Sequence, residues 1–193
     1  GYWTFDGKDT NWRTNTTTDL SGNGNTATMT SMSTSTSPVS GKTGQGMRFP
    51  VGTNYLRQTA NTSSLKFSST QNFSFGSWVK ITTEVNGDRG IIAWDGGSGG
   101  DRYLITVDNV TAKAIKCTIN LTVTDAIASV VPVIDLNKWY HLYCTYDDTS
   151  KIAQLYIDGV LVATSSAGSG TLTDGGGGAQ AFLMGAEATT GTD

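Results

Sequence analysis

Short runs of alternating apolar and polar residues recur along the chain, separated by clusters of Gly, Asn, Asp and Ser. This period of two is typical of strands that bury one face, and no segment keeps a helical period. The predicted strands cover Tyr2–Asp6, Gly46–Phe49, Asn54–Arg57, Phe73–Ile81, Gly90–Trp94, Tyr103–Val107, Ala114–Thr122 and Trp139–Tyr146. The pattern therefore predicts an all-β fold, arranged as a two-sheet antiparallel sandwich.

The clearest turn follows these strands, in the stretch LYIDGVLVA at residues 155–163. Asp158-Gly159 is a pair that accepts positive φ at both central positions of a type I′ turn, so it predicts a two-residue hairpin. The pairs that this register predicts are Ile157 with Val160, Tyr156 with Leu161, Leu155 with Val162 and Gln154 with Ala163.

Composition narrows the class of protein. The chain has 193 residues, which suit a single domain over residues 1–193. Only 15% of them are charged and the net charge is −3, so we expect neither a nucleic-acid partner nor an anionic lipid surface. No apolar run approaches the roughly 20 residues of a membrane helix. The chain begins at Gly1 without Met, as expected of a processed product or a module excised from a longer protein.

The two cysteines, Cys117 and Cys144, both fall on the apolar phase of predicted strands. Cysteine often behaves as a small core residue, so we expect two buried free thiols. A disulfide between them is the alternative.

Seven blocks in order carry a resemblance to a known family. They read YWTFD, DLSGNGN, GKTGQGMRF, FSFGSWVKI, KWYHLYCTYD, LYIDG and FLMGA. In this order they resemble the laminin-G-like, concanavalin A-like domains of secreted multidomain proteins. The resemblance implies a jelly-roll sandwich with one sheet curved to give a concave face. It also implies an extracellular role, usually in binding carbohydrate or protein.

One part of the family pattern is missing. Such domains usually close with a strand of the type Gly-x-Ile-Asp-x-Val-x-Ile-Tyr, which does not occur before Asp193. The resemblance implies that this closing strand pairs with the first strand, Tyr2–Asp6. We therefore expect Tyr2–Asp6, with Trp3 and Phe5 on one phase, to pair with a following segment or with another chain.

No catalytic residue is predicted. The related glucanases carry a Glu-x-Asp-x-x-Glu strand, because retaining hydrolysis needs two carboxyls about 5 Å apart. This chain has two glutamates, Glu84 and Glu187, far apart in sequence, and we interpret Asp147-Asp148 as turn residues. Ser98 lies in a Gly-x-Ser-x-Gly spelling, but a strand follows it where a hydrolase needs a helix. The protein is therefore not expected to be an enzyme.

Loop oxygens form two candidate calcium sites, because calcium takes six to eight oxygens and glycine-rich loops let carbonyls converge. The first comprises Asp6, Asp19 and Asn25, and the second comprises Asp95 and Asp101. The resemblance favours the first site. Turn aspartates that merely meet solvent are the alternative.

A second constellation is aromatic. In the predicted strand Phe73–Ile81, Trp78 points away from the apolar face, together with Ser74 and Lys80. In the predicted strand Trp139–Tyr146, the residues that point away from the apolar face are Trp139, His141, Tyr143 and Thr145. With Tyr156 across the hairpin, the predicted ligand-binding set is Trp78, His141, Tyr143 and Tyr156. Flat rings beside polar groups suit a sugar, although the same rings could be buried under loops.

These observations favour a non-catalytic extracellular module for carbohydrate binding or adhesion, with a glycan or glycoprotein surface as its partner. The alternative is a structural module of a virion fibre, decoration protein or surface filament that assembles through strand pairing. A glycoside hydrolase is the third hypothesis. The expected location is extracellular: secreted, or on a cell or virion surface.

Overall fold

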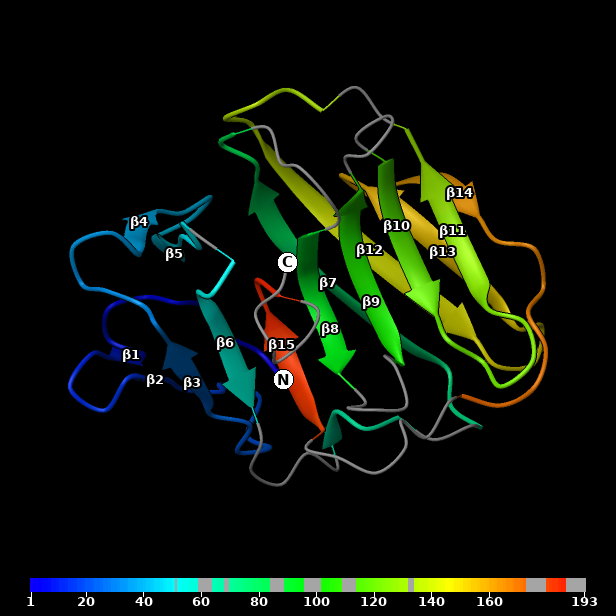
Figure 1. The fold of residues 1–193 in the computed structure, drawn as a ribbon, viewed down its shortest axis with the longest axis horizontal. Coiled ribbons are helices and arrows are strands. Elements are labelled where there is room, and N and C mark those ends of the chain that lie inside the picture. Colours follow the sequence, from blue (N-terminus) through cyan, green and yellow to red (C-terminus); the bar gives the residue numbers. More distant parts are fainter. Residues whose placement is uncertain are drawn as a thin grey trace.

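The computed structural model describes residues 1–50, 52–58, 64–67, 70–83, 89–95, 102–108, 114–131, 134–172 and 180–186. Every element named within these ranges is a β-strand, and the strands form two main sheets and one separate hairpin (Figure 1). The prediction of an all-β antiparallel sandwich is therefore confirmed. No helix in the described ranges is long and apolar enough to cross a membrane.

The larger sheet has nine strands in the order β1-β2-β3-β6-β15-β8-β9-β10-β11, and all neighbours are antiparallel. Its strands are β1 (Thr10–Asn11), β2 (Thr16–Thr17), β3 (Ala27–Thr30), β6 (Tyr55–Gln58), β15 (Ala181–Met184), β8 (Arg89–Asp95), β9 (Tyr103–Asp108), β10 (Ala114–Ile119) and β11 (Ala126–Val130).

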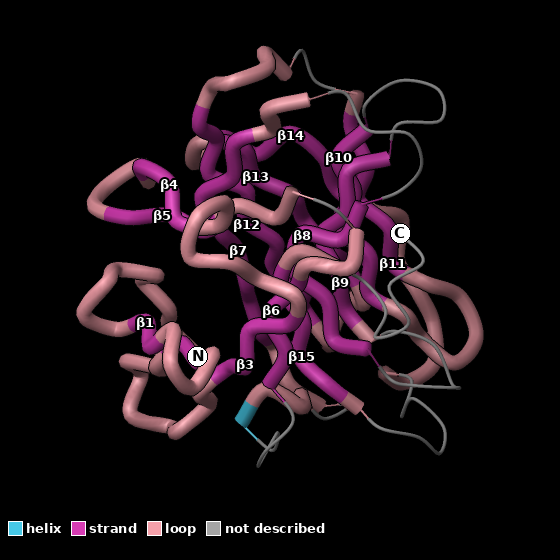
Figure 2. Tube along the Cα trace, turned by 60° about the vertical axis from the view of Figure 1, so that its left-hand side comes forward, coloured by secondary structure: helices cyan, strands magenta, loops and turns pink. Residues whose placement is uncertain are grey.

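The smaller sheet has four strands in the order β14-β13-β12-β7 and lies behind the larger sheet in Figure 1. Its strands are β7 (Phe73–Lys80), β12 (Trp139–Asp147), β13 (Ile152–Ile157) and β14 (Val160–Thr164). The separate hairpin, β4 (Pro38–Ser40) with β5 (Gln45–Met47), lies beside the end of β7. Figure 2 shows this hairpin standing out from the sheets.

The core fills the space between the two sheets, and strict alternation places it there. In β12, Tyr140, Leu142, Cys144 and Tyr146 are buried, while the residues between them are less so. They meet buried residues of the larger sheet such as Ile105. Burying each large apolar side chain contributes roughly 1.5 to 3 kcal/mol, so this inward phase fixes which face of β12 points outward.

The two cysteines join the sheets. Cys117 on β10 and Cys144 on β12 form a disulfide with their Cα atoms 5.9 Å apart, within the usual range for a bridged pair. The expectation of free thiols is wrong, because the inward phases of both strands bring the two side chains face to face across the core.

The predicted first strand, Tyr2–Asp6, is also wrong. Phe5 adopts a positive φ of 62°, which breaks an extended run. The segment is held instead by the hydrogen bond from the Leu20 N–H to the Tyr2 carbonyl and by Trp3, whose ring stacks on Phe182 at a centroid distance of 5.3 Å. Trp3 and Phe5 therefore do not share the phase of a strand. The expected pairing of this segment with a following segment or another chain stays a prediction.

The hairpin at Asp158-Gly159 is confirmed, with φ values of 51° and 81° at its two turn residues. Ile157 pairs with Val160 and Tyr156 with Leu161, as predicted. Beyond these pairs a bulge shifts the register, so Leu155 pairs with Ala163 and not with Val162, and Gln154 pairs with Thr164 and not with Ala163.

Replacing Gly159 by Val should lower the free energy of unfolding by about 1 to 3 kcal/mol, because a β-branched residue is strained at φ 81°. Urea unfolding measures this loss. Gly159→Asn is the matched control and should lose much less, since Asn tolerates the left-handed region. Equal stability of Gly159→Val and the wild type would contradict the turn assignment.

Candidate functional site

The predicted aromatic set lies together on the outer face of the smaller sheet, the face turned away from the core. His141 pairs with Trp78 across β12 and β7, and Tyr143 pairs with Tyr156 across β12 and β13. Trp78 is 45% exposed, and the other three side chains are partly buried. The alternative that loops bury Trp78 is thereby excluded, while the role of the set in binding stays a prediction.

The rings form a continuous row. The ring centroids of Trp78 and His141 are 5.2 Å apart, and those of His141 and Tyr143 are 5.8 Å apart and stacked. Both separations fall in the range of favourable aromatic contacts. The row therefore offers an extended flat surface and not a single isolated ring.

Hydroxyl and amide groups surround this row. The Tyr143 hydroxyl lies 2.6 Å from Ser74 Oγ, and the Tyr156 hydroxyl donates to Gln154 Oε1 at 2.9 Å. Each of these groups keeps further donor or acceptor capacity. A ligand with an apolar face and polar rim could thus meet rings and hydrogen-bonding groups on one surface.

Gly76 provides the space for Tyr143. A Cβ atom at Gly76 would lie 2.6 Å from Tyr143 Cδ2, a separation that real side chains do not show. Because Gly76 lacks a side chain, the Tyr143 ring lies over β7 and reaches Ser74 on that strand.

The β4–β5 hairpin adds a residue that the strand pattern did not reveal. Lys42 lies in its turn, with Nζ 4.9 Å from the centroid of the Trp78 ring. On the same face, Lys80 Nζ lies 5.1 Å from the Trp139 ring, its cross-strand partner. The alternating sequence pattern already predicts that the side chains of Trp139 and Lys80 point outward from their strands. Nothing in the sequence brings the distant Lys42 to them.

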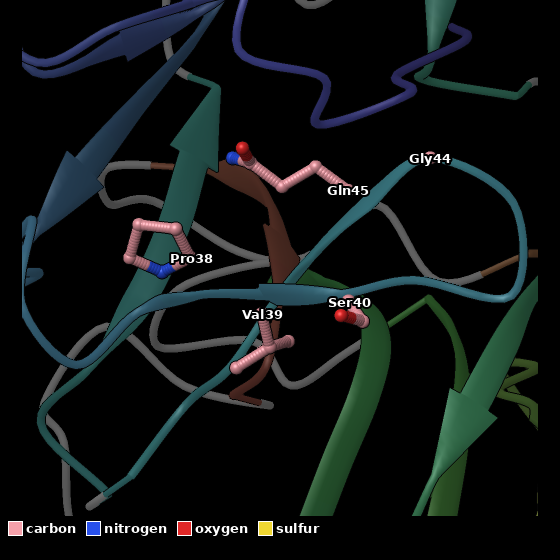
Figure 3. A pocket seen from close by; sticks show the side chains of 5 residues that line it. All are labelled: Pro38, Val39, Ser40, Gly44 and Gln45. Carbon is pink, nitrogen blue, oxygen red and sulfur yellow. The ribbon is translucent and has the colours of Figure 1, made fainter.

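The hairpin also carries an open pocket of about 370 Å³, lined by Pro38, Val39, Ser40, Gly44 and Gln45. Figure 3 shows these residues along the two strands and the turn of the hairpin. The Gln45 N–H donates to Asp6 Oδ1 at 2.9 Å, and its side-chain amide donates to the Phe5 carbonyl. The hairpin that holds Lys42 is therefore tied to the N-terminal segment.

Asp19 is a structural centre of the N-terminal region. Its Oδ1 accepts hydrogen bonds from the backbone N–H groups of Tyr2 and Ser21. Its Oδ2 accepts hydrogen bonds from the Ser21 hydroxyl and from both the backbone N–H and the side-chain amide of Asn25. All five donor–acceptor distances are within 2.9 Å. Burial alone would raise the pKa of Asp19, but these hydrogen bonds outweigh it and hold the pKa well below its ordinary value.

Of the other calcium candidates that the structure describes, Asn25 contacts Asp19, while Asp6 and Asp95 lie in other segments. Asn25 is fully buried, donates to Asp19 and accepts from Ser64, while Asp6 accepts from Gln45. Asp95 is buried at the end of β8, and Asp101 lies outside the described residues. Within the ranges that the structure describes, no three His, Cys, Asp or Glu side chains are grouped to hold a metal ion. Calcium binding stays a prediction.

Asp147 and Asp148, the acidic pair considered for catalysis, stabilise a turn at the end of β12. The Ser150 hydroxyl and the Thr149 N–H donate to Asp147 and lower its pKa, whereas a general acid needs a raised one. Asp148 accepts from Tyr146 and Lys151. Glu84, Glu187 and Ser98 lie outside the described residues.

Comparison with known proteins gives the family. The sequence matches the Concanavalin A-like lectin/glucanases superfamily over residues 52–193. The chain belongs to this superfamily. The superfamily contains both lectins and glucanases, so membership alone does not separate binding from catalysis. No curated protein matches this sequence.

Three solved structures are similar to this chain to different degrees. A tryptophan-to-alanine mutant of HCR/D is 13% identical, with a TM-score of 0.63, and the match covers 88% of this chain and 41% of that chain. This likeness shows the fold alone. A carbohydrate-binding module from Bacillus subtilis is 18% identical over 81% of this chain and 89% of its own, with a TM-score of 0.44. An alginate lyase from an Alteromonas species is 12% identical over 68% and 58%, with a TM-score of 0.41.

Proposed function

We propose that this member of the superfamily is a non-catalytic module that binds glycans through the outer face of its smaller sheet. The carrying observation is the row of Trp78, His141 and Tyr143, continued by Tyr156, on a face where Trp78 is 45% exposed. An exposed indole next to hydroxyl and amide groups suits a sugar, whose C–H face stacks while its hydroxyls form hydrogen bonds.

The absence of catalysis is part of the proposal. Both carboxylate oxygens of Asp147 and Oδ1 of Asp148 accept hydrogen bonds from nearby residues, and the lowered pKa of Asp147 does not suit an acid catalyst. We expect no release of reducing sugar from any polysaccharide that the protein binds. Release that disappears in Asp147→Asn would favour a glycoside hydrolase.

An extracellular location is likewise proposed. The disulfide between Cys117 and Cys144 supports it, because disulfides persist mainly in oxidising compartments. The same bond would suit a domain on a cell or virion surface.

A structural module of an assembly is the second candidate. It is supported by exposed apolar side chains on the end strands β11 and β14, where Ile127 is 47%, Val160 63% and Leu161 46% exposed. Exposed apolar residues on end strands favour association. Concentration-dependent assembly in sedimentation, without glycan binding, would favour this candidate.

A glycan array tests the proposed function. We expect the wild type to bind, and Trp78→Ala to lower the affinity about tenfold, since loss of one stacking ring costs roughly 1 to 2 kcal/mol. Ile127→Ala is the matched control: Ile127 is similarly exposed but lies on the larger sheet, so this variant should bind normally. Repeating the array with a chelator tests calcium.

A wild type that binds no glycan would contradict the proposed function. Binding that Trp78→Ala and Ile127→Ala weaken equally would contradict the proposed surface. Loss of binding in the chelator would support the calcium prediction.

A further inference from the structure

The two lysines beside the aromatic row, Lys42 and Lys80, differ in their partners from three other described lysines. Three described lysines form ion pairs with aspartates: Lys8 with Asp9, Lys138 with Asp135 and Lys151 with Asp148. Within the described residues, Lys42 and Lys80 form no ion pair and lie over the rings of Trp78 and Trp139 instead. No carboxylate among the described residues therefore forms an ion pair that neutralises their charges.

The two lysine–tryptophan pairs lie next to each other. Trp139 and His141 alternate along β12, and their cross-strand partners are Lys80 and Trp78. Cross-strand and diagonal neighbours on one face lie within reach of long side chains. Two positive charges thus border the two indole rings, on a chain whose net charge is −3.

Two described carboxylates bond to backbone N–H groups of the same sheet and of the hairpin. Asp158 lies in the β13–β14 turn and accepts the His141 backbone N–H, and Asp6 accepts the Gln45 N–H under the hairpin. Neither forms an ion pair with Lys42 or Lys80. An anionic group above the rings would therefore meet two ammonium groups that form no ion pair with any described carboxylate.

We propose that the glycan bound here is an anionic polysaccharide, whose carboxylate or sulfate groups contact Lys42 and Lys80 while its sugar rings contact Trp78 and Trp139. This inference rests on the proposed function and names the ligand class for the same face. An exposed cation–π contact is weak, so each lysine can exchange it for an ion pair with the ligand.

A purely structural role for these lysines makes a different prediction. In that case their aliphatic stems cover the indole rings, and the charge itself does not matter for the ligand. Replacing both lysines by Gln keeps much of the stem and removes the charge. The double variant Lys42→Gln/Lys80→Gln therefore separates the two roles.

The experiment uses two matched pairs of polymers. Dextran sulfate is compared with dextran, and polygalacturonate with its methyl ester, so that sulfate and carboxylate are tested apart on constant backbones. Isothermal titration measures the affinity of the wild type, Trp78→Ala, Lys42→Gln/Lys80→Gln and Lys116→Gln. Lys116 is a control for general charge, because it lies on the outward phase of β10 in the other sheet.

We expect the wild type to prefer at least one charged polymer to its neutral counterpart, and to bind it more weakly as salt rises, since salt screens exposed charges. The double lysine variant should lose about tenfold in affinity for that polymer, as expected for two exposed ion pairs. Its affinity for the neutral counterpart should not change, and Lys116→Gln should match the wild type.

The contrary outcomes separate this inference from the proposed function. Equal affinity for charged and neutral polymers, lost in Trp78→Ala, would overturn the anionic ligand but keep glycan binding. Equal losses in the double variant and Lys116→Gln would also overturn it, because the attraction would then be nonspecific. No binding to any of the four polymers would count against the proposed function itself, and the inference would fall with it.

Discussion

Replacing Cys117 and Cys144 together by Ala is expected to lower the free energy of unfolding by about 3 to 4 kcal/mol. The disulfide joins residues 27 positions apart, so it closes a long loop in the unfolded chain and restricts that chain strongly. It also links β10 to β12 across a core in which both cysteines are fully buried. Urea unfolding of the oxidised wild type and the double variant measures the loss.

Reduction provides the control for this prediction. A reductant should destabilise the wild type but leave the Cys117→Ala/Cys144→Ala variant unchanged, since the variant has no disulfide to break. Mass spectrometry of the intact protein under denaturing conditions should show a mass that is lower by two hydrogen atoms before reduction than after it. Free thiols in the native protein, with no effect of the reductant on stability, would contradict the disulfide.

Asp19→Ala should destabilise the protein by about 2 to 4 kcal/mol. Five donors converge on this carboxylate, which is only 7% exposed, and the substitution leaves them without an acceptor. Thermal unfolding measures the loss. Asp135→Asn is the control, because the Asp135 side chain is 64% exposed and should contribute little.

The pH dependence of stability tests the same carboxylate. The pKa of Asp19 is lowered in the folded protein, so the unfolded chain binds its proton more readily. The stabilisation is therefore fully present above the unfolded pKa of about 3.9 and is lost as the pH falls towards the folded value. Asp19→Asn should flatten the fall in stability below about pH 4. An unchanged acid profile would contradict the role assigned to Asp19.

The sequence predicts the long strands well and the short ones poorly. Alternation predicts β7 and β12, because each buries one face against the opposite sheet. The two-residue strands β1 and β2 are too short to show a period. In β15 all four residues are buried, so its AFLM run has no alternation to detect.

The N-terminal segment shows why a strand-like composition was not enough. The run from Tyr2 to Asp6 is rich in strand formers, but Phe5 takes a positive φ and Trp3 turns inward to stack on Phe182. Tertiary packing therefore overrides the local pattern. The sequence likewise does not reveal the bulge, which makes Ala163 and not Val162 the cross-strand partner of Leu155. The turn residues determine only the pairs next to the turn.

The site was predictable where it depended on strand phase. Trp78, His141 and Tyr143 share one face because their neighbours must point into the core. Lys42 was not predictable, because it reaches Trp78 from a hairpin far earlier in the chain. The grouping of Asp19 with Asn25 was anticipated as a calcium site, but the structure engages both side chains in hydrogen bonds to protein groups.

The most direct test of the central claim is a titration of the isotope-labelled protein with the polysaccharide it binds most tightly, followed through the indole N–H signals of its five tryptophans. The account predicts that the signals of Trp78 and Trp139 shift, while that of Trp94, fully buried on the inner face of β8, stays in place. Trp78→Ala should remove one shifting signal and weaken the shift of the other. Shifts confined to Trp3, Trp12 or Trp94 would place the glycan elsewhere and contradict the proposed binding face.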